Sequence, residues 1–264
     1  MRPVQITPAI VLRSWSFGES DRIVSFLTES HGKLTGIAKG AKRSKKRFIN
    51  SLEPFSLVRL RFQDNTYKSL AFILACELEK SYKNLISSLE KIAMASYCVE
   101  ITDGLLPERE ENRVIFEHLK KALTRLEIGE PSLMSLMGFE LKLLHLAGYQ
   151  PVLDSCRCCG LCRPRSCEAP SLLQSHWHFS LSDGGVLCEN CSKLKKEILP
   201  LSDQTLDLMT DLQQEQSVPA NLVSSTAVLK QARAVVLRFI QFHMDKDIKS
   251  APFLHQFYSE SASA

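Results

Sequence analysis

Several features that identify common protein classes are missing from this 264-residue chain. Nowhere do 18 uncharged apolar residues follow one another, and the first residues have no apolar run behind a basic start. The sequence therefore predicts neither a membrane span nor a secretory signal, and we expect a cytoplasmic protein. A GxxxxGK phosphate-binding loop, a GxGxxG motif and a paired acid and base are also missing. We therefore expect no enzymatic activity.

Acidic residues are absent between Gly32 and Arg47, although the net charge of the whole chain is only +4. Residues 1–80 hold 14 Lys and Arg against 7 Asp and Glu. Clustered positive charges repel one another, and a polyanion that displaces small counterions relieves this repulsion. A nucleic-acid backbone is therefore the expected partner, and a solvated loop is the alternative. The basic residues of this segment are Lys33, Lys39, Lys42, Arg43, Lys45, Lys46 and Arg47.

Five short runs before residue 80 have a β-like pattern, with Gly, Ser, Asn or Asp between them. In the fourth run Val58, Leu60 and Phe62 alternate with other residues, so one face can enter a core. Arg59 and Arg61 then point outward, where they either extend a nucleic-acid surface or face water. Five such strands favour an OB-type barrel, and an SH3-like barrel is the second choice. The runs cover residues 8–15, 22–28, 33–38, 56–62 and 67–74.

Aromatic residues accompany the basic segment. Barrels of this type bind single strands by combining a positive groove with aromatic stacking surfaces. Trp15, Phe17, Phe48 and Phe55 are available for that role. Such residues more often lie in a core, and the sequence does not orient them.

The apolar period changes to a helical one after residue 80. Gly148 suits the left-handed position just past a helix end, and Pro151 prevents the helix from continuing. Seven of the nine cysteines lie between residues 151 and 199, where there is little periodicity. This segment is therefore expected to be an insertion in a helical domain. The expected helices cover about residues 81–105, 111–126, 132–147, 201–215 and 225–246.

Together these patterns predict an α+β multidomain chain. Its amino-terminal part is an OB-type β-barrel, followed by an α-helical domain with an inserted zinc-ribbon-like module. The expected divisions are an OB-fold DNA-binding domain at 1–80, the first part of the helical domain at 81–150, a four-cysteine zinc-binding module at 151–199, the second helical part at 200–250 and a tail at 251–264.

Two cysteine pairs have the spacing that lets neighbouring thiolates meet on one ion: Cys156 with Cys159, and Cys188 with Cys191. Four thiolates complete a tetrahedron and leave no open position. The pattern therefore predicts one structural Zn2+ per chain. A catalytic zinc is disfavoured because the deaminase pattern of HxE followed by PCxxC is missing.

Other uses of the cysteines and histidines stay open at this point. Cys159 with Cys162 is a second possible pair, and His176 and His178 lie between the two main pairs. Free thiols are expected at Cys76, Cys98 and Cys167, because a cytosolic chain does not require a disulfide framework.

The order of several motifs resembles a known family. The run FGESDRIVSFLTESHGKLTGIAKGAKRSKKRF, with LEPF shortly after it, resembles the amino-terminal barrel signature of the RecO family of bacterial DNA repair proteins. The likeness continues through FELKLLHLAGYQP, a CxxCG pair and FSLSDGGVLCENC. By matching position, Lys39, Gly40 and Arg43 correspond to the basic loop of the family. The four cysteines at 156, 159, 188 and 191 correspond to its zinc ligands.

This resemblance implies a recombination mediator that is not an enzyme. Members of the family bind single- and double-stranded DNA through the barrel, anneal complementary strands and act with the RecR partner. They help the RecA recombinase to load on single strands coated by SSB, whose C-terminal tail some members bind. A cytoplasmic, nucleoid-associated location follows. The alternative from the residues is a zinc-ribbon RNA-binding protein or transcription factor.

Overall fold

The computed structural model describes residues 3–44, 46–64, 70–163, 176–215 and 225–259. Lys45 and Cys167 lie outside these ranges. Contacts divide the chain into two units, which are described separately. The first contains Met1–Pro131 and Ile248–Tyr258, and the second contains Ser132–Asp247 and Ser259–Ala264. Among the described residues, no helix is both long and apolar enough to cross a membrane.

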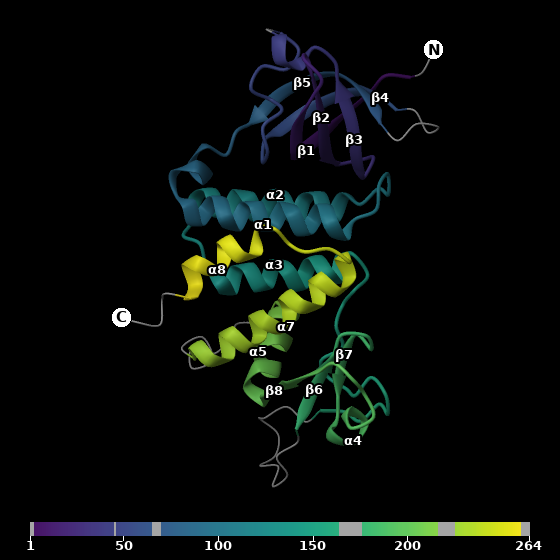
Figure 1. The fold of residues 1–264 in the computed structure, drawn as a ribbon, viewed down its shortest axis with the longest axis vertical. Coiled ribbons are helices and arrows are strands. Elements are labelled where there is room, and N and C mark those ends of the chain that lie inside the picture. Colours follow the sequence, from purple (N-terminus) through teal and green to yellow (C-terminus); the bar gives the residue numbers. More distant parts are fainter. Residues whose placement is uncertain (1–2, 45, 65–69, 164–175, 216–224, 260–264) are drawn as a thin grey trace. The chain divides into compact units, whose positions relative to one another are not determined.

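The first unit begins with a closed five-stranded barrel (Figure 1). Neighbouring strands follow the order β1-β2-β3-β5-β4, and β4 pairs with β1 to close the barrel. All pairs are antiparallel except β3 with β5. The predicted OB-type barrel is confirmed. Its strands are β1 (Gln5–Phe17), β2 (Asp21–Thr28), β3 (Lys33–Ala38), β4 (Leu57–Gln63) and β5 (Ala71–Lys80).

The barrel interior follows the alternation expected of strands. Val58, Leu60 and Phe62 are fully buried, whereas Arg59 and Arg61 between them are exposed. The prediction for this run is therefore confirmed. Gly36 of β3 also faces inward, where a side chain would overlap Ile73 of β5. A side chain at Gly36 would thus interfere with the pairing of β3 with β5.

Helices follow the barrel in the first unit. The 3-10 helix η2 (Lys83–Ser87) leads into α1 (Leu89–Leu105), and α2 (Arg113–Ile128) follows. Ser88 caps α1 and Asn112 caps α2, because each side chain accepts a bond from a backbone N–H of the first turn. Figure 1 shows α1 and α2 side by side next to the barrel.

Residues expected to form a tail contain a helix, α8 (Ala251–Ser259). Glu100 of α1 accepts bonds from the backbone N–H groups of Lys249 and Ser250, directly before this helix. Leu254 is 2% exposed. A buried apolar contact and an acidic cap thus order a segment that has little helical signal of its own.

Over its described residues, the second unit combines three longer helices with a small sheet. Helix α3 ends before Gly148, whose φ of 83° is the left-handed conformation expected there. The cysteine-rich segment between α3 and α5 forms the three-stranded sheet β7-β6-β8. The elements are α3 (Leu133–Leu146), β6 (Trp177–Ser180), β7 (Gly185–Leu187), α4 (Glu189–Ser192), β8 (Ile198–Leu201), α5 (Asp203–Gln213) and α7 (Thr226–Met244).

Candidate nucleic-acid interface and metal site

The basic loop, residues 39–56, connects β3 with β4 and contains the 3-10 helix η1 (Ala41–Arg43). Three apolar side chains of the loop, Ala41, Phe48 and Leu52, belong to the barrel core. The backbone carbonyl of Arg47 also accepts a bond from the Cys76 N–H on β5. The loop is therefore packed against the barrel at several points, which fix the backbone beside its described basic residues.

An acidic residue holds the start of the basic loop. The Asp21 carboxylate accepts a 2.8 Å hydrogen bond from the Gly40 N–H, and Gly40 has a left-handed φ of 69°. This hydrogen bond lowers the pKa of Asp21, and the Ser20 hydroxyl and the nearby charges of Lys39 and Lys42 lower it further. Asp21 therefore stays ionised and fixes the loop to the β1–β2 turn.

Two loop cations take part in the same framework. Lys42 donates from its backbone N–H to the Ser20 carbonyl and from Nζ to the Gly18 carbonyl, at 2.9 and 2.8 Å. Arg47 donates to the Lys39 carbonyl at 2.9 Å and lies over the Phe48 ring. In the part of the loop that the structure describes, the exposed cations are Lys39, Lys42, Arg43, Lys46 and Arg47.

Three other predicted contact residues lie elsewhere. Lys33 donates from Nζ to the Asp103 carbonyl at 2.6 Å, and only 13% of its side chain is exposed. Arg59 is exposed on β4, where it forms an ion pair with Glu79 at 3.2 Å. Arg61 is exposed on the same strand. The structure therefore brings together the described cations of the loop, Lys39, Lys42, Arg43, Lys46 and Arg47, and separates Lys33 from them.

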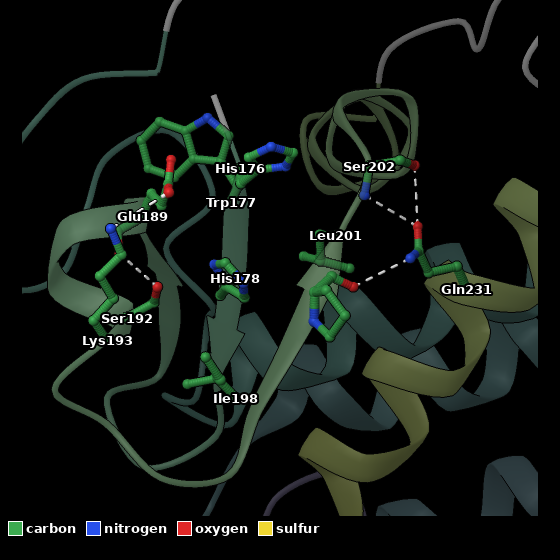
Figure 2. Close-up of a pocket in the computed structure, with 11 residues that line it drawn as sticks. His176, Trp177, His178, Glu189, Ser192, Lys193, Ile198, Leu201, Ser202 and Gln231 are labelled. Carbon is green, nitrogen blue, oxygen red and sulfur yellow. Dashed lines mark hydrogen bonds and ion pairs between the residues drawn. The ribbon is translucent and has the colours of Figure 1, made fainter. Parts of the chain in front are cut away.

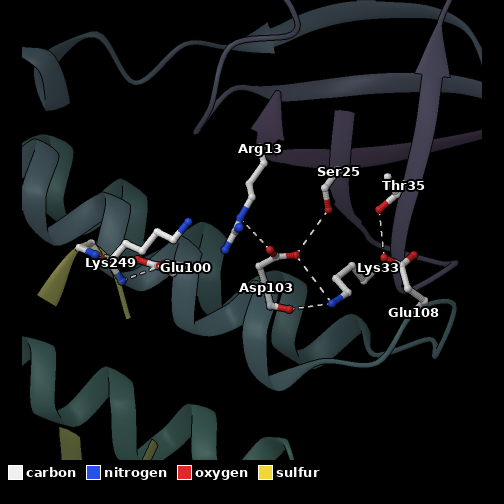
Figure 3. Close-up of polar contacts among 9 residues, drawn as sticks. Arg13, Ser25, Lys33, Thr35, Glu100, Asp103, Glu108 and Lys249 are labelled. Atoms are coloured by element: carbon white, nitrogen blue, oxygen red, sulfur yellow. Dashed lines mark hydrogen bonds and ion pairs between the residues drawn. The ribbon is translucent and has the colours of Figure 1, made fainter. Parts of the chain in front are cut away.

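Acidic residues after the barrel cover part of its outer face, as Figure 3 shows. The Asp103 carboxylate of α1 lies 2.8 Å from Arg13 and 3.7 Å from Lys33. Glu108 accepts a 3.0 Å bond from Thr35. These carboxylates neutralise the cations on this part of β1 and β3, so the basic loop is the main unneutralised group of cations on the described part of the barrel.

The four aromatic candidates have different positions. Trp15 and Phe17 are 44% and 50% exposed, whereas Phe48 is buried and Phe55 is half-buried with a positive φ. Phe72 of β5 is also exposed, and the sequence interpretation missed it. Its neighbours Ala71 and Ile73 are buried, and because all three residues of the run AFI are apolar, no alternation in the sequence marks Phe72 as the exposed one.

In the second unit, the structure brings together the four cysteines of the two main pairs. The Sγ atoms of Cys156, Cys159, Cys188 and Cys191 all lie within 4.8 Å of one another. The Cys159 and Cys188 sulfurs are 3.8 Å apart, and a tetrahedral zinc with bonds of about 2.3 Å requires about 3.8 Å between ligands. The four cysteines could therefore hold a metal ion, and their spacing fits zinc.

Backbone conformation and charge both favour a cation at this position. Gly160, with φ of 73°, turns the chain after the first pair, and its N–H donates to the Cys156 carbonyl at 2.9 Å. Burial opposes ionisation of the Cys156 thiol, but N–H groups of Cys159, Cys188 and Cys158 lower its pKa to about 6. Contact with the Cys188 thiol instead raises the pKa of Cys191. Four thiolates so close together need a cation to balance their charge.

The alternative ligands lie outside this cluster. The Cys162 sulfur is exposed and lies 3.9 Å from the Gly160 carbonyl. His176 and His178 instead line a separate hollow of about 530 Å³ beside β6, β8 and α4 (Figure 2). Neither histidine joins the group of mutually close metal-type donors in the described ranges. The first register, Cys156 with Cys159, is the one that the geometry favours.

The fold and the two sites define a class of protein: an OB barrel with a basic surface loop, followed by helices and a cysteine module of the zinc-ribbon type. Comparisons with known proteins identify one family over most of the chain. Residues 1–82 match the family described as Recombination protein O N terminal, and residues 86–252 match Recombination protein O C terminal. The chain belongs to the RecO family of DNA repair proteins, and the predicted family is confirmed.

Curated relatives match along nearly the whole chain. DNA repair protein RecO of Syntrophus aciditrophicus is 32% identical over 258 residues, which cover 97% of this chain and 96% of the relative. DNA repair protein RecO of Myxococcus xanthus is 34% identical over 248 residues, with 94% and 96% covered. The protein of the same name from Caldanaerobacter subterraneus is 32% identical over 250 residues, with 94% and 96% covered.

Proposed function

We propose that this protein binds DNA through the basic loop and acts as a recombination mediator in DNA repair. The observation that supports this most directly is the fixed loop, whose described residues include five exposed cations on a closed OB barrel. Each cation can replace a counterion of the phosphate backbone, which is a sequence-independent source of affinity. As a mediator the protein binds single-stranded DNA, and it also binds duplex DNA.

The mediator role consists of two steps that require no bond chemistry. The protein anneals complementary strands because its cations screen the repulsion between two polyanions. Together with RecR, it helps RecA to load on single strands coated by SSB, whose C-terminal tail it binds. It acts in the cytoplasm at the nucleoid and is not an enzyme. Membership of the RecO family supports these finer roles.

The cysteine module holds one structural Zn2+ per chain. Four thiolates would fill a tetrahedron, so no open position is left for water or a substrate. The ion would join the loop that carries Cys156 and Cys159 to the start of α4, which carries Cys188 and Cys191. Its chemical contribution is the stabilisation of the small sheet and of the turns that carry the cysteines.

Measuring single-strand affinity against salt tests the proposal. Five phosphate contacts predict a log-log slope of about −3.5 on single strands, because each contact contributes about 0.7. Replacing Lys39, Arg43 and Lys46 by Glu should weaken binding at least about tenfold and reduce the slope to about −1.4 or less. These three are chosen because Lys42 and Arg47 hold the loop in shape.

A control with the same change in net charge is Lys121, Arg125 and Lys230 to Glu, three exposed positions outside the barrel. This control should leave both affinity and slope nearly unchanged. A flat salt dependence of the unaltered protein, or equal losses in the two triple variants, would contradict the proposal. A matched RNA strand that competes better than DNA would favour an RNA-binding protein instead. Annealing of SSB-coated strands, with and without RecR, then tests the mediator steps.

A further inference from the structure

The outer face of the barrel carries an apolar row beside the basic loop. Residues directly opposite one another in paired strands point to the same face of a sheet. Trp15 of β1 is opposite Ile23 of β2, Ile23 is opposite Ile37 of β3, and Ile37 is opposite Phe72 of β5. These four side chains therefore form one continuous row across four strands, which we call the cross-strand row.

The ends of this row are aromatic and open. Trp15 is 44% exposed and Phe72 is 36% exposed, whereas Ile23 between them is 8% exposed. Strands about 4.8 Å apart place the two rings roughly 14 Å from each other. The row thus presents two separate aromatic rings, with the apolar side chains of Ile23 and Ile37 between them.

A register irregularity in β1 produces this arrangement. Val11 is opposite Phe26 inside the barrel, but the register shifts between Val11 and Arg13. After the shift, Ser14 is opposite the buried Val24, and Trp15 turns to the outer face. Such a bulge reverses which side chains face the core. Without it, regular alternation would direct Trp15 into the barrel.

Positive charge is placed at both ends of the row. The Nζ atom of Lys39 lies 5.7 Å from the centre of the Phe72 ring. At the other end, Lys42 binds the Gly18 carbonyl in the turn that follows Trp15 and Phe17. The opposite border of the row is different, because Asp103 and Glu108 cover Arg13, Lys33 and Thr35 there. The cations on that side are already paired with carboxylates, so a phosphate backbone gains more by following the basic loop.

We propose that the cross-strand row stacks unpaired bases of single-stranded DNA while the basic loop binds the adjoining phosphates. This rests on the proposed function, since it assumes that DNA is the ligand of the basic loop. Aromatic rings bind any base through its face, so the row gives affinity for single strands without reading their sequence. A base within a duplex is stacked on its neighbours and is not available to the two rings.

The protein carries its own reporter for this contact. Trp15 is one of two tryptophans, and the other, Trp177, is 2% exposed in the second unit. Binding of a dT oligonucleotide should quench the Trp15 fluorescence, while an abasic strand of equal length should bind without the quench. Because each stacked base contributes about five- to 150-fold in affinity, the abasic strand should bind at least about fivefold more weakly at the same salt concentration.

Substitutions test the two rings separately. Trp15→Ala and Phe72→Ala should each weaken dT binding at least about fivefold and leave the affinity for the abasic strand unchanged. Trp15→Phe keeps a ring, so it should retain the affinity and lose the quench. Leu78→Ala is the matched control, because Leu78 lies on β5 and is 40% exposed, much like Phe72.

The outcomes separate this inference from the proposed function. If dT and abasic strands bind equally well, with the expected salt slope and no quench, the row does not contact bases although the basic loop still binds DNA. If neither strand binds, the proposed function fails and the row has no ligand. Because the first comparison uses the unaltered protein, a variant that does not fold cannot hide either result.

Discussion

Asp21 is an acid within a surface that is expected to bind a polyanion. Its carboxylate accepts from the Gly40 N–H, so one negative charge is used to fix the position of several positive ones. The same hydrogen bond is the largest cause of the lowered pKa of Asp21. A lowered pKa means that the ionised form stabilises the folded loop at pH values above the ordinary carboxyl pKa. This contribution is lost as the pH falls through the lowered value of the folded protein.

Asp21→Ala should therefore loosen the start of the loop at neutral pH. Hydrogen exchange of the Gly40 and Lys42 amides should become several-fold faster. The Gly40 N–H loses its acceptor, and the Lys42 N–H lies in the same turn and bonds to Ser20, next to Asp21. Asp21→Asn keeps an acceptor oxygen and should show a smaller effect. Glu19→Gln, on the same turn, is the control for charge alone. Equal exchange in Asp21→Ala and the unaltered protein would show that the carboxylate does not hold the loop.

At the scale of elements, alternation and period predicted most of the architecture. The run containing Val58, Leu60 and Phe62 was readable because each inward residue is apolar and each outward residue between them is Arg. The face of Trp15 was not readable, because the bulge in β1 depends on pairing with β2 and leaves no mark in local composition. The cysteine pairs were readable because a chelate fixes their spacing. The contact of Lys33 with Asp103 could not be predicted, because the two residues are 70 positions apart in the sequence.

Helix α8 shows how one distant side chain can order a segment. Glu100→Ala should destabilise α8, because the backbone N–H groups of Lys249 and Ser250 and the Ser250 hydroxyl lose their acceptor. The expected cost is about 1 kcal/mol, as for the loss of a helix cap. Limited proteolysis should then cleave near residue 250 sooner. Glu100→Gln keeps one acceptor oxygen and should have a smaller effect. Unchanged protection in the alanine variant would contradict this role.

At the scale of the whole molecule, the barrel and the cysteine module belong to different contact units. If the cysteine module holds zinc as proposed, Cys188→Ser should remove one of its four ligands and unfold the module, because such sites contribute about 10 to 16 kcal/mol in small domains. The variant should contain less than one zinc per chain, while its affinity for single-stranded DNA stays unchanged.

Cys162→Ser is the matched control, because its sulfur lies outside the four-thiol group. This variant should keep one zinc per chain by elemental analysis and the melting temperature of the unaltered protein. If Cys162→Ser lost the metal while Cys188→Ser kept it, the ligand assignment would be wrong. If Cys188→Ser abolished DNA binding, the module would be required for the barrel to act.

The parallel pairing of β3 with β5 has a consequence for how the protein folds during synthesis. It joins Gly36 and Ile37 to Ala71 and Phe72, a contact of long sequence separation that is slow to form. Until the ribosome has released β5, the barrel has an unpaired edge, and Arg47 has no Cys76 partner. Emergence of β5 from the ribosome is thus the step that completes both the basic loop and the cross-strand row. A pause before that point would expose the β3 edge to other chains and favour aggregation.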